Sequence, residues 1–197
     1  MAPQTCTWPG FVARVATPAT PVQIVATLAD AWPAVIGTEP TRGELSACAA
    51  QVMLETGARM GRPPTGYWNG NAGNVRGEYG EGRWWTSFAA GEGYGAHAVT
   101  LAVGPANRFR SYVGPFEDPA DPEVQAVARA RGVRDYLSLL VRRYPAALAC
   151  AALDDMRGYV AALHAGGYFT AHPGTYARTE EALRATILEL PQVRAFA

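Results

Sequence analysis

The chain has 197 residues, enough for one compact domain with a sizeable core and short for two. Its 17 basic and 17 acidic residues balance, which argues against nucleic acid or an anionic membrane as the main partner. The three cysteines and three histidines are scattered without ligand spacing, so we expect reduced cysteines, no metal and no cofactor.

Residues 1–19 are rich in Pro and Thr and predict an extended arm, followed by a single domain over residues 20–197. The N-terminus has no basic segment followed by an apolar one, and no apolar run reaches about 18 residues, which predicts no export signal and no membrane span. Thr20 and Pro21 predict the start of a helix, which Pro33 and Gly37 end or kink.

The stretch ELSACAAQVMLETG, residues 44–57, predicts the next helix. Thr41 and Glu44 form a T-x-x-E capping box at its start, and Gly57 stands where a left-handed cap would close it. Helical spacing places Glu55 on the same face as the apolar residues of this helix. A partly buried carboxyl has a raised pKa and can serve as a general acid, although a solvated glutamate in the last helical turn is the simpler alternative.

Between residues 58 and 83, Gly, Asn and Pro recur so often that we expect a long loop. Loops of this length inside a compact domain are usually functional or disordered. Amides can fix sugar hydroxyls and aromatic rings can stack on sugar faces, so the loop's aromatic and amide residues are candidates for binding a sugar: Tyr67, Trp68, Asn69, Asn71 and Asn74. The alternative is a cluster of Gly and Asn turns that two core aromatics hold in place.

Three short segments rich in β-branched and aromatic residues follow, at residues 84–90, 97–103 and 108–113. They predict a small antiparallel sheet or hairpin, whose ladder Gly91, Gly93 and Gly95 would break. From residue 123 onward the apolar spacing is helical, with two amphipathic helices, a short helix at residues 145–153 between them, and a last helix that Pro191 ends. The expected fold is therefore α+β, mainly helical with a small antiparallel β lobe.

Five strings along the chain match one family in the family's order: AAQVMLET, WNGNAGNVRG, RFRSY, RDYLSLL and GYFTAHPGTYA. Together they resemble the glucosaminidase family of flagellar peptidoglycan hydrolases, bacterial autolysins and phage-type endolysins. The matches run from about Ala50 to Ala177, roughly two-thirds of the chain. This resemblance implies a lysozyme-like fold with a cleft between the helical and β lobes, and cleavage of β-1,4 glycosidic bonds in peptidoglycan next to N-acetylglucosamine.

The resemblance also implies roles for individual residues. The family's catalytic glutamate falls on Glu55, which would protonate the leaving glycosidic oxygen. Tyr168 falls in the family's tyrosine-rich motif and would line the sugar cleft, and Tyr112 ends the matching string RFRSY. Asn71 and Asn74 fall in the family's asparagine loop, where hydrogen bonds that stabilise the loop are as good an explanation as sugar contact.

One departure from the family concerns the second carboxylate. Family members often carry a Thr-x-Glu pattern on the β element, but here Thr86, Ser87 and Phe88 occupy the nearest such string. Glu92 is the best local substitute, and Glu78 and Glu81 are further candidates in the loop. Without a second carboxylate, the N-acetyl group of the substrate could assist, so both mechanisms remain open.

The leading hypothesis from the sequence is a peptidoglycan N-acetylglucosaminidase. A non-catalytic cell-wall-binding or particle-assembly module, and a muramidase or lytic transglycosylase, are the alternatives. The expected partner is the peptidoglycan glycan, with no nucleic acid and no membrane. Because no export signal is expected, we predict delivery to the cell wall by a phage tail, an injection particle or a lysis pore. The two termini are candidates for docking segments on such a particle, and frayed chain ends are the simpler alternative.

Overall fold

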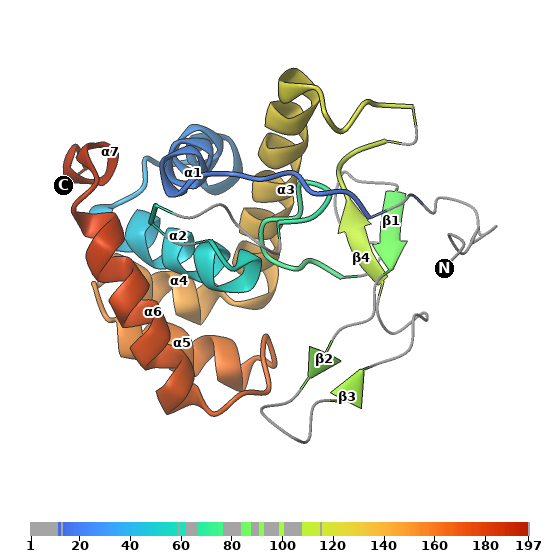
Figure 1. Ribbon diagram of the computed structural model, residues 1–197. Helices are drawn as coiled ribbons and strands as arrows, with labels where there is room; N and C mark the ends of the chain where they lie inside the picture. Colours follow the sequence, from blue (N-terminus) through green and yellow to red (C-terminus); the bar gives the residue numbers. More distant parts are fainter. Residues whose placement is uncertain are drawn as a thin grey trace.

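The computed structural model describes residues 12, 14–58, 60–61, 67–76, 84–87, 91–92, 99–100, 108–114 and 116–196, with the backbone alone for the strand residues up to 108. The described part is mainly helical (Figure 1). Its helices are α1 Pro21–Ile36, α2 Arg42–Thr56, α3 Pro122–Arg143, α4 Pro145–Ala152, α5 Met156–Ala165, α6 Pro173–Leu188 and α7 Pro191–Arg194. Within these residues, no helix has both the length and the apolar character needed to cross a membrane.

The ends of the first two helices follow the sequence signals closely. Thr41 and Glu44 form the predicted capping box, since the Thr41 hydroxyl accepts the Glu44 N–H while the Glu44 carboxylate accepts the Thr41 N–H at 2.8 Å. Gly57 closes α2 with a φ of 69°, the left-handed conformation that glycine adopts without a steric penalty. The helix that carries Glu55 therefore has fixed ends, and Glu55 lies in its last turn.

Helix α1 ends at its cap Gly37 as predicted, with Pro33 inside the helix. Helix α6 ends at Leu188, before Pro191, but it is not the last helix as expected: Pro191 takes the first position of α7, where a residue without an N–H is tolerated.

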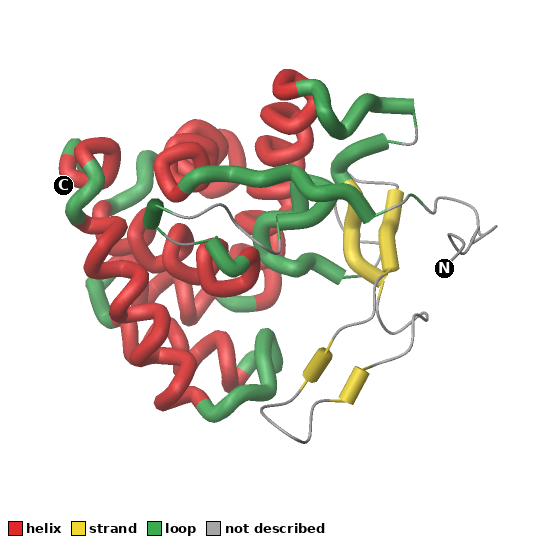
Figure 2. The backbone as a smooth tube through the Cα atoms, in the orientation of Figure 1, coloured by secondary structure: helices red, strands yellow, loops and turns green. Residues whose placement is uncertain are grey.

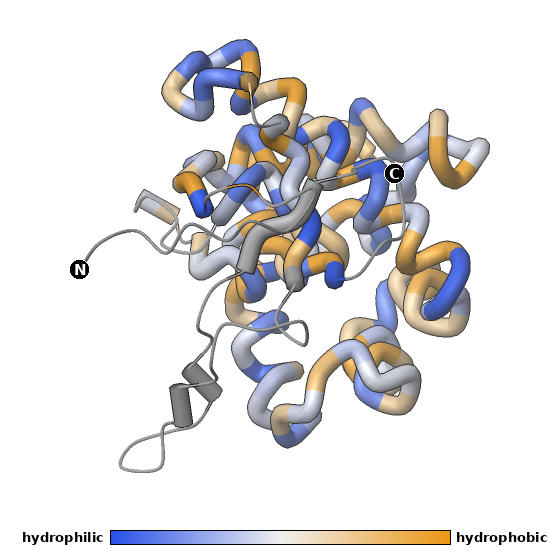
Figure 3. The backbone as a smooth tube through the Cα atoms, turned by 90° about the vertical axis from the view of Figure 1, so that its right-hand side faces the viewer, coloured by the Kyte–Doolittle hydropathy of each residue, from blue (hydrophilic) through white to orange (hydrophobic). Residues whose placement is uncertain are grey.

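Helix α2 lies at the centre of the helical part, in contact with α1, α4, α6 and α7 (Figure 1). Its side chains Leu45, Cys48, Val52 and Met53 are fully buried. Hydrophobic and hydrophilic residues alternate along the surrounding helices, which is the pattern of helices with one buried face (Figure 3). Burial raises the pKa of the Cys48 thiol to about 12, so this free cysteine is an inert core residue.

The strands form two separate antiparallel pairs on one side of the helices (Figure 2). In the first pair, β1 Trp84–Ser87 runs beside β4 Arg108–Ser111, with Trp84 opposite Ser111. In the second pair, β2 Gly91–Glu92 runs beside β3 Val99–Thr100. The expectation that Gly91 breaks the ladder is wrong, because Gly91 pairs with Thr100.

Candidate active site

Glu55 receives three side-chain hydrogen bonds, from three different parts of the chain. Oε1 accepts one from Gln51 Nε2 at 2.9 Å, within α2, and one from the Tyr176 hydroxyl at 2.5 Å, from α6. Oε2 accepts one from Asn74 Nδ2 at 2.7 Å. The Tyr176 hydroxyl in turn accepts a hydrogen bond from Gln51 Nε2 at 2.6 Å. The carboxyl group is therefore fixed in orientation while the residue stays partly exposed.

Burial of the carboxyl raises the pKa of Glu55 above its ordinary value, because it disfavours the charged form. The hydrogen bonds from Tyr176, Asn74 and Gln51 and the positive charge of Arg76 oppose this shift without cancelling it. Since Oε1 already accepts two donors, an acid proton on this group belongs on Oε2. Burial favours the protonated form of this carboxyl, and the hydrogen bonds stabilise the carboxylate form.

Asn74 reaches Glu55 from the asparagine loop, the name used here for residues 67–76. Asn71 closes this loop on itself, since its Oδ1 accepts the Val75 N–H at 2.8 Å and its Nδ2 donates to the Val75 carbonyl at 3.0 Å. Asn74 has a φ of 49°, a conformation that asparagine tolerates better than most residues. The loop therefore presents Asn74 to the carboxyl group, and the loop-stabilising explanation is confirmed for Asn71.

Tyr168 and Tyr176 come from the GYFTAHPGTYA string, on either side of the start of α6. The Tyr168 hydroxyl donates to the Gly73 carbonyl at 2.8 Å, so this side chain supports the asparagine loop. Phe169 stacks on the ring of Tyr176, with the ring centres 3.7 Å apart and the planes 3° from parallel. This stack fixes the ring plane of Tyr176 and thereby the direction of its hydrogen bond to Glu55.

Three of the predicted sugar-binding residues are buried and have structural contacts. Tyr67 and Tyr112 are 2 % and 1 % exposed, and the Tyr112 hydroxyl donates to Asp135 at 2.5 Å. Asn71 is buried as well, with its amide bound as described above. Because these three side chains are buried, the expectation that they contact substrate is wrong. Trp68 is half-buried, and the guanidinium of Arg14 lies 4.4 Å above its ring.

The proposed second carboxylate is only partly placed. The backbone of Glu92 lies in β2 opposite Val99, while its side chain lies outside the described residues. Glu78 and Glu81 lie wholly outside them. Of the predicted site residues, the structure thus brings Asn74 into direct contact with Glu55. Tyr168 contacts the same loop one residue earlier, at the Gly73 carbonyl.

Sequence reasoning missed a buried carboxyl on α6. Glu180 follows Tyr176 by one helical turn and is fully buried, and neither of its oxygens has a hydrogen-bond partner in the part of the chain that the structure describes. Burial raises the pKa of Glu180 well above its ordinary value, and the negative charge of Glu55 raises it further. Burial without a hydrogen-bond partner thus favours the uncharged form of Glu180.

Gln51 and Tyr176 were also missed as site residues. Gln51 lies four residues before Glu55, the spacing at which helical side chains meet, and this signal could have found it. Tyr176 belongs to the same matching string as Tyr168, but its spacing to Leu183 and Ile187 is that of an ordinary apolar helix face, so the sequence gives no separate signal for it.

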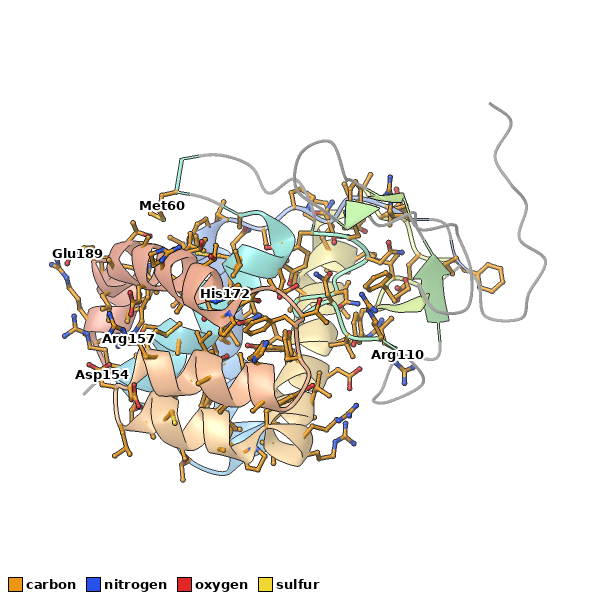
Figure 4. All side chains as sticks on the ribbon, turned by 90° about the horizontal axis from the view of Figure 1, so that it is seen from below. Met60, Arg110, Asp154, Arg157, His172 and Glu189 are labelled. Atoms are coloured by element: carbon orange, nitrogen blue, oxygen red, sulfur yellow. The ribbon has the colours of Figure 1, made fainter. Side chains whose placement is uncertain are left out.

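Three ion pairs lie at one edge of the helical part, where Asp154, Arg157 and Glu189 pair with Arg184, Glu181 and Arg194 (Figure 4). Arg110, a buried residue of β4, lies on the other side, and His172 at the start of α6 lies between them (Figure 4). Among the described residues, no three His, Cys, Asp or Glu side chains are grouped so that they could hold a metal ion.

Replacing Tyr176 by Phe is expected to move the titration of Glu55 to higher pH. The substitution removes a hydrogen bond that lowers the pKa of Glu55. NMR titration of ¹³C-labelled glutamate between pH 4 and pH 9 (about 0.5-unit steps), with Glu55→Gln to assign the signal, measures this shift. An unchanged titration would mean that Tyr176 does not act on Glu55.

Comparisons of the chain with family models, characterised proteins and solved structures give no significant match. A proposal for its function therefore rests on the residues around Glu55 and on the five strings of the sequence.

Proposed function

We propose that the protein is a peptidoglycan glycosidase of the N-acetylglucosaminidase type, with Glu55 as its general acid. The observation that carries this proposal is the environment of Glu55: a partly exposed carboxyl whose pKa is raised by burial and whose two oxygens are oriented by Gln51, Tyr176 and Asn74. A glutamate with a solely structural role would have no need of both features, since raised pKa values and fixed orientation serve proton transfer.

In the proposed reaction, Glu55 Oε2 gives its proton to the oxygen of the β-1,4 linkage as the bond from that oxygen to the anomeric carbon breaks. Positive charge develops at the anomeric carbon, and the electron pair of the broken bond stays with the protonated leaving oxygen. A water molecule then supplies the hydroxyl of the new reducing end, and its remaining proton returns the carboxylate to the acid. Tyr176, Asn74 and Gln51 stabilise the carboxylate during the interval.

The attack on the anomeric carbon needs a second group, for which the chain offers two routes. Glu92 could provide a carboxylate on the β element, or the N-acetyl group of the substrate could assist. The finer fold assignment, lysozyme-like with the cleft between helices and β lobe, belongs to the same proposal. It is supported by a glutamate at the end of a central helix, followed by the asparagine loop and short antiparallel strands.

The proposed partner is the peptidoglycan glycan strand, and the proposed setting is the cell wall. A phage tail, an injection particle or a lysis pore would bring the protein to that substrate. The proposal of delivery rests on the location of the substrate outside the cytoplasmic membrane.

Digestion of purified peptidoglycan followed by borohydride reduction and mass spectrometry tests the proposal. We expect a growing number of reducing ends, with N-acetylglucosamine as the reduced sugar. Reduced N-acetylmuramic acid would indicate a muramidase, and an anhydro sugar would indicate a lytic transglycosylase. Binding to the insoluble wall without any release of fragments would favour the non-catalytic wall-binding module.

A further inference from the structure

The segment that precedes α1 is tied to the asparagine loop along several residues. We call residues 14–17 the strap. Asn69 N–H donates to the Val15 carbonyl at 2.9 Å, and Val15 N–H donates to Asn69 Oδ1 at 3.0 Å. Ala16 forms a β-bridge with Trp68, whose ring lies under the Arg14 guanidinium. The strap therefore runs beside the first residues of the loop as an additional short strand.

Thr17 makes the innermost contacts of the strap. Its side chain is fully buried, and its Oγ1 accepts the Gly70 N–H at 2.7 Å. The same hydroxyl donates to the Tyr67 carbonyl at 3.4 Å, and the Thr17 N–H donates to that carbonyl at 3.0 Å. One threonine thus satisfies a buried backbone donor and a buried backbone acceptor of the asparagine loop.

The far side of the loop is packed so tightly that it cannot move without breaking contacts. A Cβ atom on Gly132 of α3 would lie 1.9 Å from the Gly70 carbonyl oxygen, and one on Gly73 would lie 2.3 Å from the Tyr136 ring. The loop is therefore held between the strap on one side and α3 on the other. Its tip carries Asn74, which donates to Glu55 Oε2 and, at 3.3 Å, to the Glu55 carbonyl.

We propose that Thr17 is a positioning residue of the active site, which holds the asparagine loop in the place where Asn74 reaches Glu55. The effect of Thr17 on Glu55 passes through Gly70 and the rest of the asparagine loop to Asn74. The consequence for turnover rests on the function proposed above, whereas the consequence for Glu55 itself does not.

The effect of Thr17 is separable from a direct electrostatic one, because threonine carries no charge. The titratable or charged groups with the largest interactions with the Glu55 carboxyl include Arg76, Tyr168, Tyr176 and Glu180. If replacing the Thr17 hydroxyl changes the titration of Glu55, the change therefore comes through the contacts of Thr17 with the loop. Since the Asn74 hydrogen bond lowers the pKa of Glu55, its loss should raise that pKa.

The test compares Thr17→Val, which keeps the shape of the side chain and removes the hydroxyl, with Thr17→Ser, which keeps the hydroxyl. Thr27→Val is the matched control, because the Thr27 hydroxyl bonds only the Gln23 carbonyl in α1, away from the loop. Each full-length variant is characterised by kcat/KM on peptidoglycan across pH. The pKa of Glu55 is measured separately by NMR titration of ¹³C-labelled glutamate, with Glu55→Gln to assign the signal.

For Thr17→Val we expect kcat/KM to fall by about tenfold, the loss that follows from one missing hydrogen bond to the carboxylate, and the Glu55 titration to move to higher pH. Thr17→Ser and Thr27→Val should behave like the wild type. In an Asn74→Ala background, Thr17→Val should add no further shift, since both changes remove the same contact.

An unchanged Glu55 titration in folded Thr17→Val would overturn the proposal, and so would full additivity with Asn74→Ala. If Thr17→Val does not fold, Thr17→Ala removes the same hydroxyl, and an unshifted Glu55 signal in that folded variant would overturn the proposal as well. Should the wild type prove inactive on every glycan while the titration still shifts, the positioning role would stand and the enzymatic function would fail.

Discussion

Replacing Glu55 by Gln is expected to lower the rate of peptidoglycan cleavage by about 10³-fold, within the range for loss of a general acid. Glutamine has nearly the same size and keeps a carbonyl oxygen that can accept hydrogen bonds from Gln51 and Tyr176. It has no acidic proton, so the leaving oxygen would depart as an alkoxide in the transition state. Glu55→Gln should therefore fold and still bind the wall while its turnover is lost.

The measurement is the release of reducing ends from purified cell wall, with wall binding followed by co-sedimentation. Glu39→Gln is the control, because Glu39 is an exposed loop glutamate of the same chain. Equal rates for the wild type and Glu55→Gln would remove Glu55 from the mechanism. A loss of binding in parallel with activity would instead point to damage to the fold.

Replacing Glu180 by Gln is expected to make the protein more stable at alkaline pH. The ordinary pKa of a glutamate is near 4.5, and burial holds that of folded Glu180 well above this value. Below pH 4.5 both the folded and the unfolded chain carry the proton, so the group costs no stability there. Above it, the unfolded chain releases the proton and the folded chain retains it. Stability therefore falls by about 1.4 kcal/mol per pH unit until the pH reaches the folded pKa.

Urea unfolding at several pH values between 5 and 9 (about one-unit steps) measures this slope. We expect Glu180→Gln to reduce the pH dependence of the free energy of unfolding by about one proton, or about 1.4 kcal/mol per pH unit. The pH dependence that comes from the raised pKa of Glu55 should remain. Glu181→Gln is the matched control on the same helix, since the Glu181 side chain lies at the surface in an ion pair with Arg157. Identical slopes for the wild type and Glu180→Gln would mean that Glu180 is not a protonated buried acid.

The sequence predicted the frame of the site because that frame depends on local signals. The capping residues Thr41 and Gly57 act within a few residues of α2, so the helix and the place of Glu55 could be derived from spacing alone. The mainly helical second half and the presence of short antiparallel strands also follow from local patterns, whereas the sequence did not predict that β1 pairs with β4.

The partners of Glu55 were harder to predict because they come from distant parts of the chain. Tyr176 is 121 residues away from Glu55 and Asn74 is 19, and no periodicity links such positions. Tyr67 in the predicted loop and Tyr112 in the predicted strand segment were candidates for sugar contact, but tertiary packing buries both. Glu180 was not recognised as buried because a charged residue on a helix is usually solvated, and only the packing of α6 on α2 reverses that expectation.

The most direct test of the account is a crystal structure of Glu55→Gln with an oligomer of N-acetylglucosamine bound. We expect one glycosidic oxygen to lie within about 3 Å of the side chain at position 55, on the side of Oε2, where proton transfer requires it. An oligomer bound elsewhere, or a position 55 closed off from the bound sugar by packed side chains, would contradict the assignment of Glu55 as the acid.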